Sequence, residues 1–260
     1  MKNYTKQSLI EALREIRKRG WIENLRQGNA GAIGNTLEDL LGIDENNLPI
    51  PNASEWELKT QRIGTNSLIT LFHMEPSPTA YKIVSQILLP KYGWKHKEAG
   101  NRYPNDEMSF RQTINTENYS DRGFIVEVDR KSRKIVISFD HTKIDNRHYE
   151  WKKAIEQRVG LSQITPQPYW GFDDLFHKAG TKLHNCFFVR AELENRQNKE
   201  FFRYQDILML KKLSLEKFIH AIDTGTIFVD FDARTKHNHG TKFRVKQSTI
   251  PELYCEIKEL

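Results

Sequence analysis

The stretch that decides the fold is Pro-Asn-Ala-Ser-Glu-Trp-Glu-Leu-Lys-Thr, residues 51–60. Side chains alternate between the two faces of a β-strand. In a strand over this stretch, Trp56 and Leu58 would therefore point into a core. Glu57 and Lys59 would point the other way, toward a cleft. The stretch thus predicts a strand with one apolar and one charged face.

A carboxylate two residues before a lysine, on the polar side of a strand, is an arrangement that metal-dependent nucleases use. The carboxylate holds a hard divalent cation through oxygen, and the lysine lies beside the attacking water or the developing phosphate charge. Glu55 would share this strand face and add a second carboxylate. A Glu-x-Lys pair is also a common surface charge pair, so the flanking sequence has to decide between the two readings.

The composition is that of a polar globular protein with a small excess of basic residues. Lys and Arg number 40 against 34 Asp and Glu, a net charge of +6, which permits a polyanionic partner without requiring one. The two cysteines, Cys186 and Cys255, argue against a disulfide framework or a cysteine-ligated zinc site. No stretch approaches the length of a membrane span, and we expect a cytoplasmic protein.

Helical and strand patterns alternate along the chain. Helices are expected over residues 5–19, 36–42, 79–89, 146–159, 172–182 and 214–223. Strands are expected over residues 54–61, 67–72, 123–129, 134–139, 186–193, 201–210, 227–233 and 241–245. We expect 67–72 to form a hairpin with 54–61, and 90–109 to be a long surface loop. Prominent antiparallel hairpins favour a mixed α/β (α+β) fold over an all-parallel sheet.

A segment rich in glycine and asparagine, residues 27–35, is expected to be a flexible loop before the helix at 36–42. Such a loop can bring backbone N–H groups against phosphate. It lacks the lysine of a P-loop and the strand context of a dinucleotide fold, which argues against nucleotide binding.

The order of motifs along the chain resembles the MvaI/BcnI family of type II restriction endonucleases, relatives of the mismatch-repair nickase MutH. The resemblance covers nearly the whole chain. The segments that carry it are Gly34-Asn35-Thr36-Leu37-Glu38-Asp39-Leu40-Leu41-Gly42-Ile43, Asn46-Asn47-Leu48-Pro49, Pro51-Asn52, Glu57-Leu58-Lys59-Thr60, Tyr169-Trp170-Gly171-Phe172-Asp173-Asp174-Leu175 and His237-Asn238-His239-Gly240-Thr241-Lys242-Phe243-Arg244.

This resemblance implies a PD-(D/E)xK nuclease fold, with a central mixed sheet flanked by helices and a DNA-binding cleft. Residues 1–260 would form one nuclease unit with two lobes that close around DNA, a catalytic lobe over about 1–150 and a DNA-recognition lobe over about 160–260. It further implies a monomer that nicks the two strands of double-stranded DNA in turn at a CCSGG- or CCWGG-like site. Mg²⁺, with Mn²⁺ as a substitute, would be the cofactor. A cognate DNA methyltransferase would be the genetic partner, in a prokaryotic cytoplasm.

Carried over by position, Glu57 is the acidic metal ligand and Lys59 the catalytic lysine. The carbonyl of Leu58 would complete the metal shell. Glu38, on the preceding helix, would be a further acidic residue behind the site; an exposed helix charge is the alternative reading.

The chain departs from the family where Asn52 follows a proline, because the family has an aspartate there. An amide oxygen is a weaker Mg²⁺ ligand than a carboxylate. Three explanations stay open. Glu55 could supply the missing charge, the aspartate could have been changed by engineering, or the natural protein could be slow or inactive.

A basic loop between two strands, residues 234–240, predicts a DNA-reading surface. Arg and Lys suit guanine or phosphate, Asn suits adenine, and His can donate or accept at a base edge. A solvated hairpin tip and a metal site formed by His237 and His239 are the alternatives. The candidate DNA-binding residues here are Arg234, His237, Asn238, His239, Thr241, Lys242 and Arg244.

Four further residues complete the DNA-binding prediction. The resemblance implies that His73, with His239, reads the central base pair, which favours a G·C-centred site. Arg26 and Asn29, together with Lys242, are candidate phosphate contacts, and Arg62 would line the groove next to the metal.

Three alternatives to a double-strand endonuclease remain. One is a MutH-like nickase that cuts one strand under the control of partners. The second is a cleavage-impaired DNA-binding relative, motivated by Asn52. The third is an α/β protein with no nucleic-acid role, if the family match is accidental.

Overall fold

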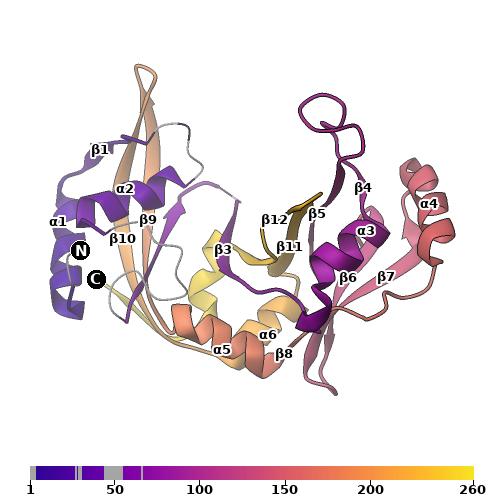
Figure 1. Cartoon of the computed structure of the whole chain (residues 1–260). Helices are drawn as coiled ribbons and strands as arrows, with labels where there is room; N and C mark the ends of the chain where they lie inside the picture. Colours follow the sequence, from indigo (N-terminus) through magenta and orange to yellow (C-terminus); the bar gives the residue numbers. More distant parts are fainter. Residues whose placement is uncertain (1–3, 27, 29–30, 44–54, 66) are drawn as a thin grey trace. The chain divides into compact units, whose positions relative to one another are not determined.

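The computed structural model describes residues 4–26, 28, 31–43, 55–65 and 67–260 (Figure 1). The chain forms two compact units, each assembled from separate segments. Unit 1 comprises residues 1–68, 179–217 and 246–260, and unit 2 comprises 69–178 and 218–245. This division differs from the expected lobes of 1–150 and 160–260, because strands that are distant in sequence pair with one another.

Unit 1 is built on one sheet with strand order β1-β10-β9-β2, to which β14 adds by pairing with β10. Its elements are α1 (Lys6–Lys18), β1 (Trp21–Glu23), α2 (Ala32–Leu41), β2 (Glu57–Arg62), β9 (Asn185–Arg196), β10 (Lys199–Leu213), the 3₁₀ helix Gln247–Leu253 and β14 (Tyr254–Glu259). β9 and β10 form the long hairpin visible in Figure 1. β2 runs parallel to β9, with Glu57 opposite Cys186, whereas the β9–β10 pair is antiparallel.

The N-terminal helix forms where its sequence predicts it. The Thr5 side chain accepts from the backbone N–H of Ser8, and the Ser8 side chain accepts from the backbone N–H of Thr5, which completes a capping box. Leu9, Leu13 and Ile16 are buried at helical spacing. The prediction of a helix over 5–19 is confirmed.

The second helix begins earlier than expected. α2 starts at Ala32, so residues 32–35 of the glycine-rich segment are its first turn rather than part of a loop. Gly42 ends it with φ +67°, a left-handed conformation that glycine adopts without strain. A Cβ at Gly34 would lie 3.3 Å from Oγ1 of Thr60, so the helix lies close against β2 at this point.

The side chains of β2 divide between two faces as the alternation predicts. Trp56 and Leu58 belong to the apolar core that α1 and α2 form with the sheet, and the Trp56 and Phe187 rings lie 4.6 Å apart. β2 itself begins at Glu57, so Glu55 lies in the exposed turn before the strand rather than within it.

Unit 2 contains a sheet of order β3-β13-β11-β5-β4, with β12 added beside β11, and a second sheet of order β6-β7-β8. Its strands are β3 (Leu68–His73), β4 (Trp94–Lys95), β5 (Met108–Ile114), β6 (Arg122–Asp129), β7 (Lys134–Ile144), β8 (Tyr169–Gly171), β11 (Ile227–Arg234), β12 (His237–Asn238) and β13 (Lys242–Lys246). Its helical segments are the 3₁₀ turn Thr79–Tyr81, the π-helix Val84–Leu88, α3 (Leu89–Tyr92), the 3₁₀ turn Asn146–His148, α4 (Tyr149–Val159), α5 (Phe172–Leu183) and α6 (Leu215–Asp223). The last residues of α5 and the first of α6 belong to unit 1.

Aromatic side chains fill the core of unit 2. Phe110 lies 5.4 Å from both Phe124 and Phe231, and Phe124 lies 5.1 Å from Phe139, measured between ring centroids. All four are buried. These contacts hold β5 and β11 against the β6–β7 hairpin, which was predicted correctly at 123–129 and 134–139.

Three local predictions fail in this region. Residues 67–72 do not pair with the Glu57 strand, since β3 joins β13 in another sheet. The helix expected over 79–89 is a 3₁₀ turn followed by a π-helix and α3, and Pro90 cannot donate the N–H that a regular helix needs there. The expected loop over 90–109 contains part of α3, β4 and the start of β5.

Within the described residues, no helix combines the length and apolar character that crossing a membrane requires.

Candidate active site and DNA-binding surface

The buried carboxylate of Glu57 is the centre of the candidate active site. Its side chain is 1% exposed, and its Oε1 lies 2.7 Å from Nζ of Lys59 on the same strand. A second lysine, Lys182 in the last turn of α5, brings its Nζ to 3.6 Å from the same oxygen. Two ammonium groups therefore offset the charge of one buried carboxylate.

The other oxygen of Glu57 has a different environment. Oε2 is buried and has no hydrogen-bond partner among the described residues. A buried carboxylate oxygen without a partner is costly. A buried carboxylate oxygen without a hydrogen-bond partner is suited to bind a hard cation such as Mg²⁺, which prefers carboxylate oxygen.

The remaining ligands of such a cation are not grouped in the described part of the chain. No three His, Cys, Asp or Glu side chains among those residues lie close enough together to hold a metal ion. Glu38, half-buried on α2, and Glu55, exposed in the turn, therefore do not join Glu57 in such a group. Asn52 lies outside the described residues, so Glu57 and the Leu58 carbonyl are the predicted ligands that the structure places.

Two buried, uncharged groups lie near Glu57. Cys186, the parallel-strand partner of Glu57, is fully buried, and burial raises the pKa of its thiol above the ordinary value, with the Glu57 charge adding to the effect. Burial likewise raises the pKa of Tyr254, whose hydroxyl donates to the Leu183 carbonyl at 2.8 Å. The raised pKa values keep Cys186 and Tyr254 protonated, so neither adds negative charge near Glu57.

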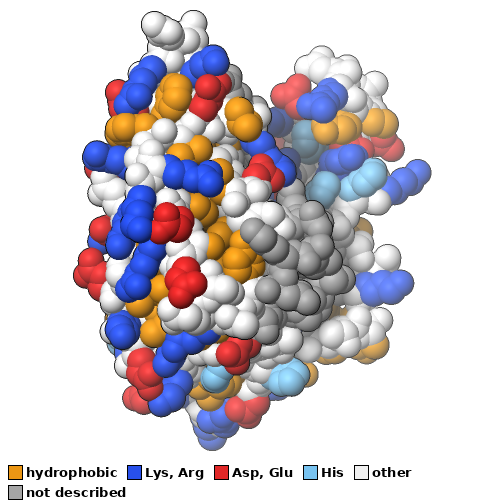
Figure 2. Space-filling model, turned by 90° about the vertical axis from the view of Figure 1, so that its left-hand side faces the viewer, with side chains coloured by type: hydrophobic (Ala, Val, Ile, Leu, Met, Phe, Trp, Pro, Cys, Tyr) orange, Lys and Arg blue, Asp and Glu red, His pale blue; other side chains and the backbone are white. Residues whose placement is uncertain are grey.

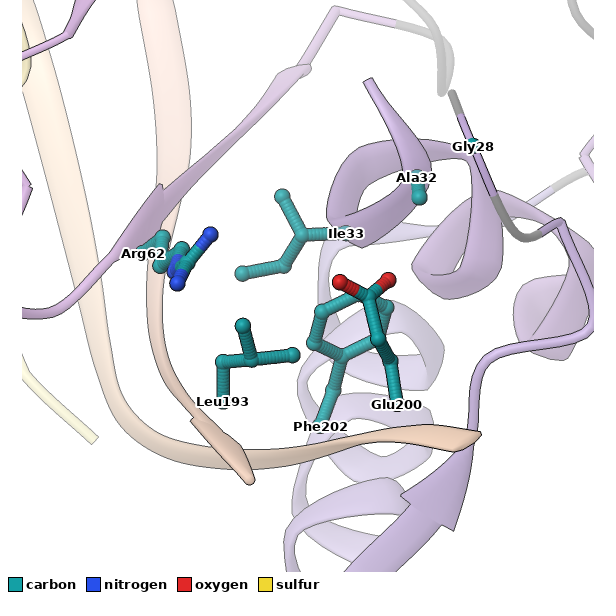
Figure 3. A pocket seen from close by; sticks show the side chains of 7 residues that line it. All are labelled: Gly28, Ala32, Ile33, Arg62, Leu193, Glu200 and Phe202. Atoms are coloured by element: carbon teal, nitrogen blue, oxygen red, sulfur yellow. The ribbon is translucent and has the colours of Figure 1, made fainter. Parts of the chain in front are cut away.

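Arg62, predicted to line the groove beside the metal, occupies a different place. It is three residues beyond Lys59 on β2, so its side chain leaves the opposite face of the strand. There it lines a hollow of about 360 Å³ with Ile33, Leu193, Phe202 and Glu200 (Figure 3). The hollow combines two charged side chains, Arg62 and Glu200, with the apolar Ile33, Leu193 and Phe202.

Arg26 and Asn29 are the residues of unit 1 that were predicted to contact phosphate. Arg26 makes two hydrogen bonds to the carboxylate of Asp39, at 2.7 and 2.6 Å, so a phosphate would compete with this ion pair. Asn29 lies outside the described residues. Figure 2 shows a face on which Lys and Arg side chains are interspersed with Asp and Glu, so the positive excess is not gathered there into one patch.

In unit 2 the predicted DNA-reading loop and His73 come together. A Cβ at Gly240, where φ is +85°, would lie 3.3 Å from Cδ2 of His73. His73 is exposed at the end of β3. The rings of His237 and His239 lie 6.5 Å apart and nearly parallel. His73 and the loop that carries His239 therefore lie next to each other in unit 2.

Internal contacts hold this loop in shape. The Asn238 side chain accepts from the Gly240 N–H at 3.0 Å, and the Arg234 guanidinium lies 3.0 Å from Glu107. Thr241 is fully buried, and its N–H donates to Glu75 at 2.8 Å, so its contacts are with the protein. The exposed side chains of this loop are those of Lys236, His237, Asn238 and His239.

Lys242 and Arg244 lie on β13 beside carboxylates of β11. Lys242 Nζ is 3.1 Å from Asp232, and Arg244 is 3.5 Å from Asp230. Neither these aspartates nor Lys182 were among the residues predicted from the sequence. Period-two alternation in β11 was the available signal for the aspartates, whereas Lys182 looked like any lysine near a helix C-terminus.

Comparison with known proteins identifies the family. Residues 10–254 match the sequence model of the MvaI/BcnI restriction endonuclease family. The chain belongs to this family. Among solved structures it is similar to the restriction endonuclease MvaI in complex with its cognate DNA substrate, at 25% identity and a TM-score of 0.74, covering 99% of both chains. It is also similar to MvaI in the absence of DNA, at 25% identity and a TM-score of 0.56, covering 100% of this chain and 99% of that one.

A search of curated proteins returned no match. The family match and the structural likeness confirm the expected mixed α/β restriction-endonuclease fold and the resemblance seen in the sequence.

Proposed function

We propose that this member of the MvaI/BcnI family is a type II restriction endonuclease that cuts double-stranded DNA at a short CCSGG- or CCWGG-like site. It would act as a monomer that nicks each strand in turn, with Mg²⁺ as cofactor and Mn²⁺ as a substitute. A methyltransferase of the same specificity would protect the host DNA. The observation that carries the proposal is that the two carboxylate oxygens of Glu57 differ in their surroundings. Lys59 and Lys182 lie beside Oε1, whereas the buried Oε2 has no hydrogen-bond partner among the described residues.

In this proposal Glu57 Oε2 and the Leu58 carbonyl would hold the cation, together with Asn52. A divalent cation supplies charge stabilisation at the phosphate and lowers the pKa of water. Lys59 stays on Oε1, where its ammonium group can orient the attacking water. Lys182 neutralises the same carboxylate from the side of α5.

The test compares the protein with Lys59→Met and Glu57→Gln on supercoiled plasmid and phage DNA, in Mg²⁺ and then in Mn²⁺. We expect discrete fragments from the protein, with nicked plasmid appearing before linear plasmid. Each variant should lose at least about a hundredfold in cleavage rate, while binding of the same DNA in Ca²⁺ persists. A variant that still cuts at the parental rate would remove its residue from the mechanism.

A cleavage-impaired DNA-binding protein is the second candidate, favoured by Asn52 in place of the family's aspartate. Asn52→Asp tests it directly. Fragments only from Asn52→Asp would mark this chain as disabled for cleavage, whereas fragments from the unchanged chain would show that Asn52 is tolerated. Plasmid that stops at the nicked form would favour a MutH-like nickase.

A further inference from the structure

The hollow beside Arg62 in unit 1 has walls of three kinds. It measures about 360 Å³, and the side chains on which the following argument rests are Arg62, Glu200, Ile33, Leu193 and Phe202 (Figure 3). Its volume lies at the low end of the roughly 300–1,000 Å³ of small-molecule pockets. Arg62 leaves the face of β2 opposite to Glu57 and Lys59, so the hollow is separate from the candidate active site.

The floor of the hollow is apolar. Leu193 on β9 lies opposite Phe202 on β10 in the strand register, so both side chains point to the same face of the sheet. Ile33, in the first turn of α2, adds a third apolar side chain. The Tyr204 hydroxyl donates to the Ile33 carbonyl at 2.8 Å and holds this turn against β10. An apolar floor with an aromatic ring suits a flat ligand that stacks on it.

The carboxylate of Glu200 is held in a fixed position. Asn24, which is only 1% exposed, donates from its side-chain amide to Oε2 of Glu200 at 2.7 Å and from its backbone N–H to the Glu200 carbonyl at 2.8 Å. Among the described residues, nothing donates to the other oxygen, Oε1. A fixed carboxylate with acceptor capacity to spare suits a ligand that carries N–H groups.

The guanidinium of Arg62 supplies the opposite charge. The backbone N–H of Arg62 donates to the Gln247 side chain at 3.2 Å, whereas its guanidinium forms no ion pair within the described part of the chain. Arg62 and Glu200 enter the hollow from different sides, with the apolar side chains between them (Figure 3). The two charges therefore do not neutralise each other. A guanidinium binds phosphate oxygens through two parallel hydrogen bonds.

A ligand that satisfies all three walls has an anion at one end, N–H donors at the other and a flat body between them. An amino acid does not meet this description, because one carbon joins its carboxylate to its ammonium group and the two charges cannot reach separate sides. A nucleotide does meet it. Guanine is the base whose Watson–Crick edge presents two adjacent donors, N1–H and the N2 amino group, which one carboxylate can accept together. Adenine has an acceptor at N1 instead.

We propose that this hollow binds a guanine nucleotide, with the phosphate on Arg62, the base on the apolar floor and its Watson–Crick edge on Glu200. That edge is occupied inside a base pair, so the nucleotide is either free or unpaired in DNA. The glycine-rich segment of the sequence lacks the lysine of a P-loop, and Arg62 supplies the cation from β2 instead. The inference is independent of the proposed cleavage of DNA.

The test measures binding of GMP and AMP by isothermal titration calorimetry, in EDTA and without DNA. Arg62→Met removes the cation, and Glu200→Gln places an NH₂ group where guanine has its donors. Arg196→Met and Glu194→Gln are the matched controls, because these two residues pair with each other on the opposite face of the same hairpin. Thermal melting confirms that each variant is folded, and Arg62→Lys or Glu200→Asp replaces a variant that is not.

The parent and both controls should bind GMP at least about tenfold more tightly than AMP, because adenine offers the carboxylate one donor fewer. Arg62→Met should lose about tenfold to a hundredfold in affinity for GMP. Glu200→Gln should lose the preference for GMP over AMP, a change that damage to the fold alone does not produce.

A second arm distinguishes the source of the nucleotide. Fluorescence anisotropy compares duplexes that contain one unpaired dG, one unpaired dA or no unpaired base. If GMP alone does not bind, the duplex with unpaired dG should still bind more tightly than the other two, and both hollow variants should abolish this gain.

The inference is overturned if neither GMP nor the unpaired dG shows binding that depends on Arg62 and Glu200. Equal affinity of the parent for GMP and AMP would also overturn it, as would an equal loss in the two control variants. None of these results bears on cleavage, since no arm measures it.

Discussion

At the scale of single residues, Glu57 shows what the sequence can and cannot predict. Its place two residues before Lys59 on one strand face was readable from alternation alone. Lys182 was not, because its distance of 3.6 Å from Glu57 depends on where α5 ends relative to β2. Short-range spacing contains no such information, and only the folded unit brings this second lysine to the carboxylate.

The role of Lys182 leads to a prediction about metal binding. Lys182→Met should lower the melting temperature of the metal-free protein by a few degrees, because a buried carboxylate loses one of its two cations. The same change should increase the stabilisation by Mg²⁺, since one positive charge near the cation is gone. Differential scanning fluorimetry with and without Mg²⁺ measures both effects.

Lys178→Met, one turn earlier on α5, is the control for that prediction and should show neither effect. If Lys182→Met instead reduced the stabilisation by Mg²⁺, Lys182 would support the binding of Mg²⁺ rather than oppose it.

At the scale of elements, local patterns predicted hairpins well and parallel pairing not at all. The β6–β7 and β9–β10 hairpins join neighbours in sequence, so alternation and a turn were enough to find them. The parallel pairing of β2 with β9 joins segments that many residues separate, and nothing local distinguishes β9 from other apolar strands. The ion pairs of Asp230 and Asp232 on β11 could not be predicted for a similar reason, because their partners lie on the two strands beside β11.

Two helix glycines give opposite predictions. Gly34→Val should destabilise the protein and reduce cleavage, because α2 lies against β2 at Thr60 and a branched side chain would push the helix from the strand that carries Glu57. Gly180→Ala in α5 should raise stability by about 0.5–1 kcal/mol, because its new Cβ meets nothing within 4 Å and alanine is the better helix former. Urea unfolding of the two variants checks both signs, and a destabilised Gly180→Ala would contradict the open surroundings of that position.

At the scale of the whole molecule, carboxylates with hydrogen bonds or nearby cations make the stability of the folded protein depend on pH. Six carboxyl groups among the described residues have a pKa lowered below its ordinary value by hydrogen bonds and nearby cations. They are Asp121, Asp129, Asp140, Glu194, Asp232 and Glu256. A carboxyl group whose pKa is lower in the folded state stabilises that state above its unfolded pKa, near 3.8 for Asp and 4.5 for Glu. This contribution is lost as the pH falls through the folded-state pKa.

The urea midpoint should therefore fall steeply between about pH 5 and about pH 2. Asp121→Asn should make the fall shallower, because it removes one of these carboxyl groups. Burial raises the pKa of Asp121, but the hydrogen bond from His148 and the charges of Arg122 and Arg147 lower it by more. Asp106→Asn, in an exposed loop, serves as the control. An equal pH slope in Asp121→Asn and the parent would remove Asp121 from the explanation.

The parallel pairing of β2 with β9 also has a consequence during synthesis. A ribosome releases Glu57 and Lys59 early, but Cys186 and the rest of β9, like Lys182, emerge only when most of the chain has been translated. Domains fold as their segments emerge from the ribosome. A nascent chain therefore cannot assemble this candidate active site, and a polypeptide released prematurely, before Asn185, lacks the strand with which the Glu57 strand pairs.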